Sequence, residues 1–263
     1  MRSATDLQFY RDNGYLHCPA VFAEHELEEM RAALDRILAG VSGTRDDANH
    51  AWRDGDDEPS KLELKGFHGV QYHDAAFARA MAHPGMTAVL TELIGPNVQV
   101  HHTKMLVKPP EKGAPFPMHQ DYPYFPHERH SVVAASIHLD EADLDNGCLR
   151  VAPGSHHRGP LPFYGQSRHA DTEEFPIEAG TALPAQAGDV LFFSYLTVHG
   201  SGVNASTRPR RNVLVQYRDP ADPPILEDGL ERHVDWGQGL MVAGSNTDYW
   251  QRRPRFELLP LAR

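Results

Sequence analysis

Apolar positions recur with helical spacing in the first hundred residues of the chain. From Glu24 to Leu38, leucine, isoleucine and methionine follow one another at intervals of three and four, which predicts an amphipathic helix that ends near Gly40. Residues 75–94 show the same helical spacing of apolar residues, interrupted at His83-Pro84-Gly85. Because proline and glycine break helices, this stretch predicts two short helices.

Two further segments of the N-terminal part give weaker signals. Thr5, with Gln8 three residues later, resembles a capping box, and Asn13-Gly14 is a typical helix end. We therefore expect a helix between them, followed by a short apolar strand. Residues 41–60 contain glycine, serine, asparagine and acidic residues but few apolar ones, which indicates a loop or a lid.

Beyond Val98 the pattern changes to short alternating or wholly apolar runs bounded by turn residues, which is typical of strands. The predicted strands are 98–107, 131–139, 148–152, 188–198 and 212–217. Asp145-Asn146-Gly147 lies between two of them and predicts a hairpin, since Asn and Gly tolerate the positive φ of a tight turn. Helices followed by antiparallel strands favour an α+β fold, with a double-sheet β core against N-terminal helices in one domain.

Composition and charge narrow the function. The 263 residues include 25 basic and 36 acidic side chains, a net charge of −11, so the chain gains little from the counterion release that drives nucleic-acid binding. The longest apolar stretch, Val190–Val198, is too short to cross a membrane, and the polar Met1–Tyr10 does not resemble a signal peptide. Two cysteines, Cys18 and Cys148, indicate a reducing compartment. We expect a cytoplasmic monomer or homodimer without a nucleic-acid or membrane partner.

The 17 histidines raise the question of a metal site. A histidine and an aspartate two residues apart on a strand point to the same side and can share one ion. So many histidines, however, make such pairs common by chance. Three pairs occur: His119/Asp121, His138/Asp140 and His233/Asp235.

Sequence context distinguishes the first pair from the other two. His138 and Asp140 alternate with apolar residues beside the predicted turn, which indicates a solvated strand face, and residues 233–235 lie in an irregular polar segment. His119 instead precedes Tyr122-Pro123-Tyr124-Phe125, a group of aromatics suited to the wall of a small-molecule pocket. A buried structural histidine is the competing interpretation at this position.

A third metal ligand is expected from a distant strand. His199 follows the apolar run at 188–198 and opens the segment His199-Gly200-Ser201-Gly202. Two histidines and one carboxylate on one side of Fe(II) leave three of its six positions open for substrates. Arg210 lies where the next strand begins, and its guanidinium could form a bidentate pair with a carboxylate. A solvated basic turn at 208–211 is the competing interpretation.

Four segments, taken together, resemble one protein family. In the family's order they are Lys104–Pro110 (KMLVKPP), Met118–Asp121 (MHQD), Asp145–Leu149 (DNGCL) with Pro153–His156 (PGSH), and His199–Ser201 (HGS) with Arg210. On these residues the chain resembles the phytanoyl-CoA dioxygenase (PhyH-like) branch of the Fe(II)- and 2-oxoglutarate-dependent oxygenases. Any one segment would be weak, and the combination is specific.

The resemblance implies a fold and a site. The fold is a distorted double-stranded β-helix, a cupin-like jelly roll, for which we expect a helical part at 1–97, a core at 98–220 and a C-terminal flap at 221–263. The iron ligands and catalytic residues are His119, Asp121 and His199. The residues expected to bind or line 2-oxoglutarate are Arg210, Ser201, Met105, Lys65, Gln120 and Ser136, the last where some relatives have tryptophan. Those expected to contact the substrate are Phe116, Tyr122, Tyr124, Phe125 and Trp236.

The implied activity is oxidation with O₂, most simply hydroxylation, of an aliphatic C–H bond in a small organic molecule, coupled to decarboxylation of 2-oxoglutarate to succinate and CO₂. Asp121 favours hydroxylation, because halogenating relatives carry a small residue there. The net acidic charge disfavours a phosphorylated acyl-CoA substrate, although an acyl-CoA hydroxylase is still compatible with the sequence. So are a cupin-type metalloenzyme that does not use 2-oxoglutarate and a non-enzymatic metal-binding domain.

Overall fold

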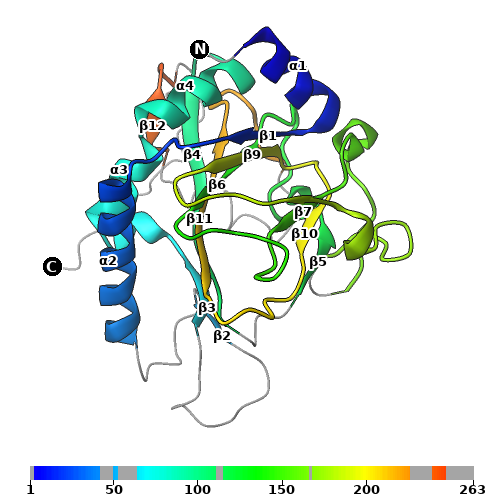
Figure 1. The fold of residues 1–263 in the computed structure, drawn as a ribbon. Helices are drawn as coiled ribbons and strands as arrows, with labels where there is room; N and C mark the ends of the chain where they lie inside the picture. Colours follow the sequence, from blue (N-terminus) through cyan, green and yellow to red (C-terminus); the bar gives the residue numbers. More distant parts are fainter. Residues whose placement is uncertain are drawn as a thin grey trace, which may run out of the picture.

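Two antiparallel sheets form the framework of the protein. The computed structural model describes residues 3–41, 50–52, 64–110, 115–165, 168–225 and 239–246. Within these ranges the larger sheet has the strand order β1-β9-β6-β11-β4-β3-β2, with β12 also pairing with β4, and the smaller sheet has the order β5-β10-β7-β8. Figure 1 shows helices α2, α3 and α4 on one side of the larger sheet and strands β5, β7 and β10 on the other.

The elements have the following bounds. The helices are α1 (Ala4–Asn13), α2 (Glu24–Val41), α3 (Ala75–Met81) and α4 (Pro84–Leu93). The strands are β1 (Tyr15–Cys18), β2 (His50–Trp52), β3 (Leu64–His68), β4 (Val98–Lys108), β5 (Phe116–His119), β6 (Val133–His138), β7 (Leu149–Val151), β8 (Thr181–Leu183), β9 (Val190–Ser194), β10 (His199–Ser201), β11 (Arg210–Arg218) and β12 (Met241–Ala243).

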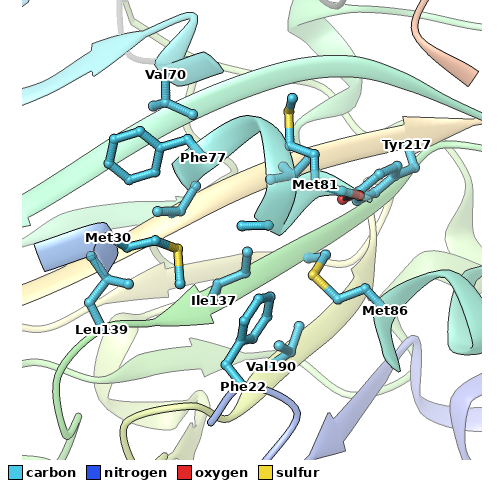
Figure 2. Close-up of a cluster of buried hydrophobic side chains, with 14 of the residues drawn as sticks. Phe22, Met30, Val70, Phe77, Met81, Met86, Ile137, Leu139, Val190 and Tyr217 are labelled. Carbon is cyan, nitrogen blue, oxygen red and sulfur yellow. Dashed lines mark hydrogen bonds between the residues drawn. The ribbon is translucent and has the colours of Figure 1, made fainter. Parts of the chain in front are cut away.

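The main hydrophobic core lies between the helices and the larger sheet. Figure 2 shows part of it: Met30 from α2, Phe77 and Met81 from α3, Met86 from α4, Ile137 from β6, Val190 from β9 and Tyr217 from β11. The Tyr217 hydroxyl donates a hydrogen bond of 2.8 Å to the Met81 carbonyl, which ties α3 to the sheet. Side chains alternate along a strand, so the opposite face of these strands, here called the inner face, is turned toward the smaller sheet. The inner face carries buried polar residues and holds the candidate site.

The helices and most long strands follow the sequence prediction. The five predicted strands correspond to β4, β6, β7, β9 and β11, and the predicted helices correspond to α1 through α4. The remaining short strands were not predicted, apart from β1, because three to five residues carry little periodic signal.

Two local predictions are wrong. The cap of α1 is Ser3, whose side chain accepts from the Asp6 amide while the Asp6 carboxylate accepts from the Ser3 amide, so the capping box is not formed by Thr5 and Gln8. The turn that contains Gly147, at φ 73°, is present. It joins β6 of the larger sheet to β7 of the smaller one, so it is not a hairpin.

The prediction of a solvated face at His138 is also wrong. His138 is 2% exposed, because β6 lies between β9 and β11 and its inner face is covered by the smaller sheet. Its neighbour Asp140 accepts two hydrogen bonds of 2.8 Å from the Arg211 guanidinium. In this central strand, both faces are buried. The alternating pattern therefore separates an apolar buried face from a polar buried face, and neither is exposed to solvent.

Three predictions fall largely outside the described residues. They are the loop or lid at 41–60, of which Val41 and β2 are described, the His233/Asp235 pair, and the C-terminal flap, of which 221–225 and 239–246 are described. In the last of these ranges, β12 pairs with β4. None of the helices in the described ranges combines the length and apolarity needed to span a bilayer.

Candidate active site

Three predicted ligands meet on the smaller sheet. His119 ends β5 and His199 begins β10, and the two residues are directly opposite each other in the antiparallel ladder. Asp121 follows in the turn after β5, where its backbone amide donates to the Tyr195 carbonyl. Its Oδ1 lies 3.5 Å from His119 Nε2 and 3.7 Å from His199 Nε2. All three side chains are buried, and their ligand atoms lie within 4.8 Å of one another.

Backbone carbonyls orient both imidazoles. Nδ1 of His119 lies 2.9 Å from the Pro117 carbonyl, and Nδ1 of His199 lies 2.9 Å from the Thr197 carbonyl. A carbonyl accepts only from a protonated nitrogen, so each ring carries its proton on Nδ1 and presents a lone pair on Nε2. Both Nε2 atoms point to the same carboxylate oxygen, which is the arrangement that a shared metal ion requires.

Electrostatics keep these groups in their metal-binding protonation states. Burial alone would raise the pKa of Asp121, but His199, His119 and the Gln216 amide lower it to about 2. Burial and the charge of His119 lower the pKa of His199 to about 4. At neutral pH the site therefore offers a carboxylate and a neutral imidazole, as metal coordination demands.

Gln216 positions the Asp121 carboxylate. It lies on the inner face of β11, is 1% exposed, and donates from Nε2 to Asp121 Oδ2 at 2.7 Å. This bond occupies Oδ2 and leaves Oδ1 turned toward the two histidines. Sequence reasoning missed Gln216, because it lies in the larger sheet and only the packing of the two sheets brings it next to the turn after β5.

We expect Gln216→Leu to weaken Fe(II) binding about 10- to 100-fold, because an unrestrained carboxylate loses the orientation that its hydrogen bond supplies. An anaerobic Fe(II) titration of the purified protein measures the change. Gln99→Leu is the matched control, since Gln99 is equally buried but bonds to Gly239 near β12. Equal Fe(II) affinity in wild type and Gln216→Leu would contradict the positioning role.

Two buried cations lie side by side near the triad. Arg210 at the start of β11 is opposite Lys108 at the end of β4. Lys108 Nζ donates to Ser201 Oγ at 2.8 Å and to the Gly202 carbonyl, and Arg210 donates to the Gly147 carbonyl. Arg210 is 7% exposed and Lys108 is 8% exposed. Among the described residues, neither has a carboxylate within ion-pair distance.

This pair of cations is electrostatically unfavourable without an anion. Burial lowers the pKa of Lys108 to about 7, with a further contribution from Arg210, and burial lowers the pKa of Arg210 to about 10. The Arg210 Nε is buried and has no hydrogen-bond partner in the described part of the chain. Ser201 stands two residues after His199 in β10, a separation of about 7 Å at ordinary strand rise, which a five-carbon dicarboxylate can span. The cations thus form an anion site at the right distance from the triad.

The comparisons with known proteins agree with this geometry. The sequence profile of the family described as Phytanoyl-CoA dioxygenase (PhyH) matches residues 10–212. The chain belongs to the PhyH family. It is 30% identical to a probable alpha-ketoglutarate-dependent hypophosphite dioxygenase of Stutzerimonas stutzeri, over 96% of this chain and 88% of that protein. It is 28% identical to an ectoine dioxygenase of Halomonas elongata, over 82% of this chain and 69% of that protein.

Solved structures support the same assignment. A non-heme alpha ketoglutarate dependent carbocyclase from nogalamycin biosynthesis, SnoK, superposes with a TM-score of 0.72 at 26% identity, covering 93% of this chain and 95% of that one. An iron-bound EctD from S. alaskensis, at 24% identity, shares the fold with a TM-score of 0.72 and covers 90% of this chain and 83% of that one. The predicted jelly-roll fold is confirmed. The protein is a PhyH-family dioxygenase that uses iron and 2-oxoglutarate, and its substrate is a small molecule.

Of three further residues expected to line the cosubstrate, two lie away from the site and one lies on the inner face. Met105 has the opposite parity to Lys108 on β4, so its side chain lies in the core beneath the helices, which corrects its expected place beside the cosubstrate. Gln120 points away from the triad: its amide donates to the Leu196 and Gly159 carbonyls and accepts from the Leu161 amide, which makes it a loop anchor. Ser136 lies on the inner face, where its hydroxyl accepts from Asn212 at 2.8 Å.

Lys65 and the five expected substrate contacts have varied positions. The backbone of Lys65 belongs to β3, and its side chain lies outside the described part, as does Trp236. Phe116 is 42% exposed, with its ring centre 4.6 Å from that of His119. Burial and the nearby charge of Asp121 raise the pKa of the Tyr124 hydroxyl. Tyr122 and Phe125 pack instead in a cluster with Val132, Tyr195 and Leu196, although the Phe125 ring also contacts His102.

Proposed function

We propose that His119, Asp121 and His199 hold Fe(II), that Arg210, Lys108 and Ser201 hold the C5 carboxylate of 2-oxoglutarate, and that the enzyme hydroxylates an aliphatic C–H bond of a small organic molecule. The observation that carries the proposal is the pair of buried cations that no carboxylate of the described residues pairs with, next to a His/Asp/His cluster. A buried charge is costly unless it is paired, so this site calls for a dicarboxylate cosubstrate.

The residues fit iron. Two neutral imidazoles and one carboxylate on one side of Fe(II) leave positions open for a chelating keto acid and for O₂. With iron and 2-oxoglutarate bound, the metal supplies O₂ activation coupled to formation of succinate and CO₂. The chain's own part is to hold the ligands and to exclude water, and a cofactor site of this kind depends on both.

Aromatic and aliphatic neighbours keep the centre dry. The Phe193 ring centre lies 4.6 Å from that of His199, and Met118 and Val198 form a buried cluster behind the histidines. Low solvent access strengthens the pairing of Arg210 and Lys108 with a carboxylate. The cations therefore anchor the distal end of the cosubstrate, while the triad fixes the end where oxidation occurs.

The names of the relatives point to several substrates and select none for this chain. They include hypophosphite, ectoine and phytanoyl-CoA. The net charge of −11 and the two buried free cysteines support an enzyme that works in the cytoplasm on a substrate other than an acyl-CoA. A monomer or homodimer without a nucleic-acid partner is part of the same proposal.

Substrate-dependent release of succinate across a metabolite panel tests the proposal. We expect at least one small organic molecule to raise succinate formation well above the rate without substrate. Hydroxylation predicts a product heavier by one oxygen atom. A cupin-type enzyme that does not use 2-oxoglutarate would consume substrate without succinate, and a non-enzymatic metal-binding domain would give neither.

Lys108 gives 2-oxoglutarate affinity a defined pH dependence. Its pKa of about 7 in the ligand-free protein means that the ammonium is present below neutral pH and is lost as the pH rises. A bound carboxylate raises this pKa again, so binding above pH 7 takes up a proton and the Kd should rise by up to about tenfold per pH unit. Calorimetric titration of 2-oxoglutarate into the iron-loaded protein, in two buffers of different ionisation enthalpy, measures how many protons are taken up on binding. Lys108→Met should bind more weakly and lose the slope, whereas a flat wild-type profile to pH 9 would contradict this role for Lys108.

A further inference from the structure

A second lysine lies on the inner face of β4. Lys104 has the same parity as Lys108 and is opposite Leu214 of β11 and His68 of β3. The two lysines are four positions apart in the chain, which is about 13 Å at ordinary strand rise. They therefore do not reach the same carboxylate. Leu214, opposite Lys104, lies two residues before Gln216, whose amide donates to Asp121 Oδ2 at 2.7 Å, whereas Lys108 is opposite Arg210. The charge of Asp121 also acts on Lys104. Lys104 therefore belongs to the iron end of the site.

Lys104 has no fixed counterion within the described ranges. It is partly exposed, and no carboxylate of the described residues forms an ion pair with it. Burial lowers the pKa of Lys104, and the charge of Asp121 raises it. A cation in this position is suited to an anion that arrives with the substrate.

Among the residues that the structure describes, the groups around Lys104 form hydrogen bonds and carry little negative charge. His68 Nδ1 lies 2.8 Å from His102 Nε2, and the Phe125 ring covers His102 at 5.5 Å between centres. The Arg168 guanidinium lies 5.1 Å from the centre of the Tyr124 ring, on which the charge of Asp121 also acts. Within the described ranges, Asp121 is the single carboxylate whose charge acts on Lys104, His102 and Tyr124.

We propose that the oxidised substrate carries an anionic group, a carboxylate or a phosphorus oxyanion, and that Lys104 binds this group beside the iron centre. The inference rests on the proposed function, because it takes the iron to lie between His119, Asp121 and His199. It narrows the substrate from small molecules in general to small anions, and it makes Lys104 a specificity-determining residue.

Binding to the anaerobic Fe(II)–2-oxoglutarate holoenzyme tests the proposal without turnover. Saturating 2-oxoglutarate blocks the site at Arg210 and Lys108. The probes are butyrate, propylphosphonate and hypophosphite, with butyramide and 1-propanol as uncharged partners, and the readout is the change in the visible absorption band of the iron–keto acid complex. Lys104→Met removes the charge at similar side-chain length, and Lys104→Arg retains it. Arg129→Met, at an exposed position, controls for loss of one surface charge.

We expect wild type to bind at least one of the anions and neither uncharged partner. Lys104→Met should weaken that binding more than tenfold, Lys104→Arg should recover most of it, and Arg129→Met should leave it unchanged. Three results would overturn the proposal: binding of an uncharged probe at least as tight as that of the anions, no response to any anion, or full anion affinity in Lys104→Met. If Lys104→Met instead loses 2-oxoglutarate itself, the lysine serves the cosubstrate and the proposal is also wrong. Failure of wild type to bind 2-oxoglutarate would contradict the proposed function, which is a separate outcome.

Discussion

Asp121→Ala should abolish Fe(II) binding and succinate formation while the protein stays folded. The substitution removes one of three ligands and leaves two buried imidazoles that cannot replace its negative charge. Asp121 Oδ1 is the atom that both Nε2 atoms face, at 3.5 and 3.7 Å, so no other described side chain completes the triad. Metal content after anaerobic loading, together with substrate-dependent succinate release, measures the loss, and thermal unfolding of the metal-free protein reports on the fold.

His138→Ala is the informative control for this experiment. His138 is as buried as the triad residues and is followed two residues later by an aspartate, but its aspartate is paired with Arg211. The His138→Ala variant should therefore retain Fe(II), even if its thermal stability falls. Comparable loss of iron in His138→Ala would overturn the choice of His119/Asp121 among the three sequence pairs, and stoichiometric iron in Asp121→Ala would remove the basis of the proposed centre.

Arg210→Ala should weaken 2-oxoglutarate binding by roughly 30-fold to several-thousand-fold. Removing one partner of a buried, hydrogen-bonded charge pair costs roughly 2–5 kcal/mol. At about 1.4 kcal/mol per factor of ten, that corresponds to roughly 30- to several-thousand-fold in Kd. Lys108 and Ser201 remain in the variant, so some binding should persist. Calorimetric titration of 2-oxoglutarate into the anaerobic Fe(II) protein gives the Kd directly.

Arg211→Ala is the matched control for Arg210→Ala. The two arginines are neighbours in β11, but Arg211 points to the other face and holds Asp140 with two bonds of 2.8 Å. Its loss should leave the 2-oxoglutarate Kd unchanged. Arg210→Lys should recover part of the affinity, since it restores the charge without the planar guanidinium. Unchanged affinity in Arg210→Ala would count decisively against an anion site for 2-oxoglutarate at this end of β11.

Sequence reasoning located the triad but not the details of its support. The aromatic context of His119 and the glycines after His199 were visible in the chain, and the fold brings the two residues opposite each other in one ladder. The basic segment at 208–211 left a solvated turn open. The structure resolves that question through burial: Arg208 precedes β11 and pairs at the surface with Glu141 and Asp143, whereas Arg210 begins the strand and is buried on its inner face.

The residues that sequence reasoning missed depend on strand register and on which face of each strand is turned toward the smaller sheet. Lys108 was visible within the KMLVKPP segment, but the pattern of β4 does not say that its even-numbered lysines face the smaller sheet while Met105 faces the helices. A lysine within a long strand that is otherwise mostly buried is the signal that would have found Lys104 and Lys108. For Gln216, no local pattern exists, because its partner Asp121 lies 95 residues away in the chain.

Anaerobic crystals of the wild-type protein with Fe(II) and 2-oxoglutarate test the central claim most directly, through anomalous scattering at the iron edge. The account predicts one strong anomalous peak coordinated by His119 Nε2, Asp121 Oδ1 and His199 Nε2. It also predicts that density for 2-oxoglutarate extends from that peak to a carboxylate between Arg210, Lys108 and Ser201. An iron peak elsewhere, or a 2-oxoglutarate whose distal carboxylate lies away from Arg210 and Lys108, would contradict it.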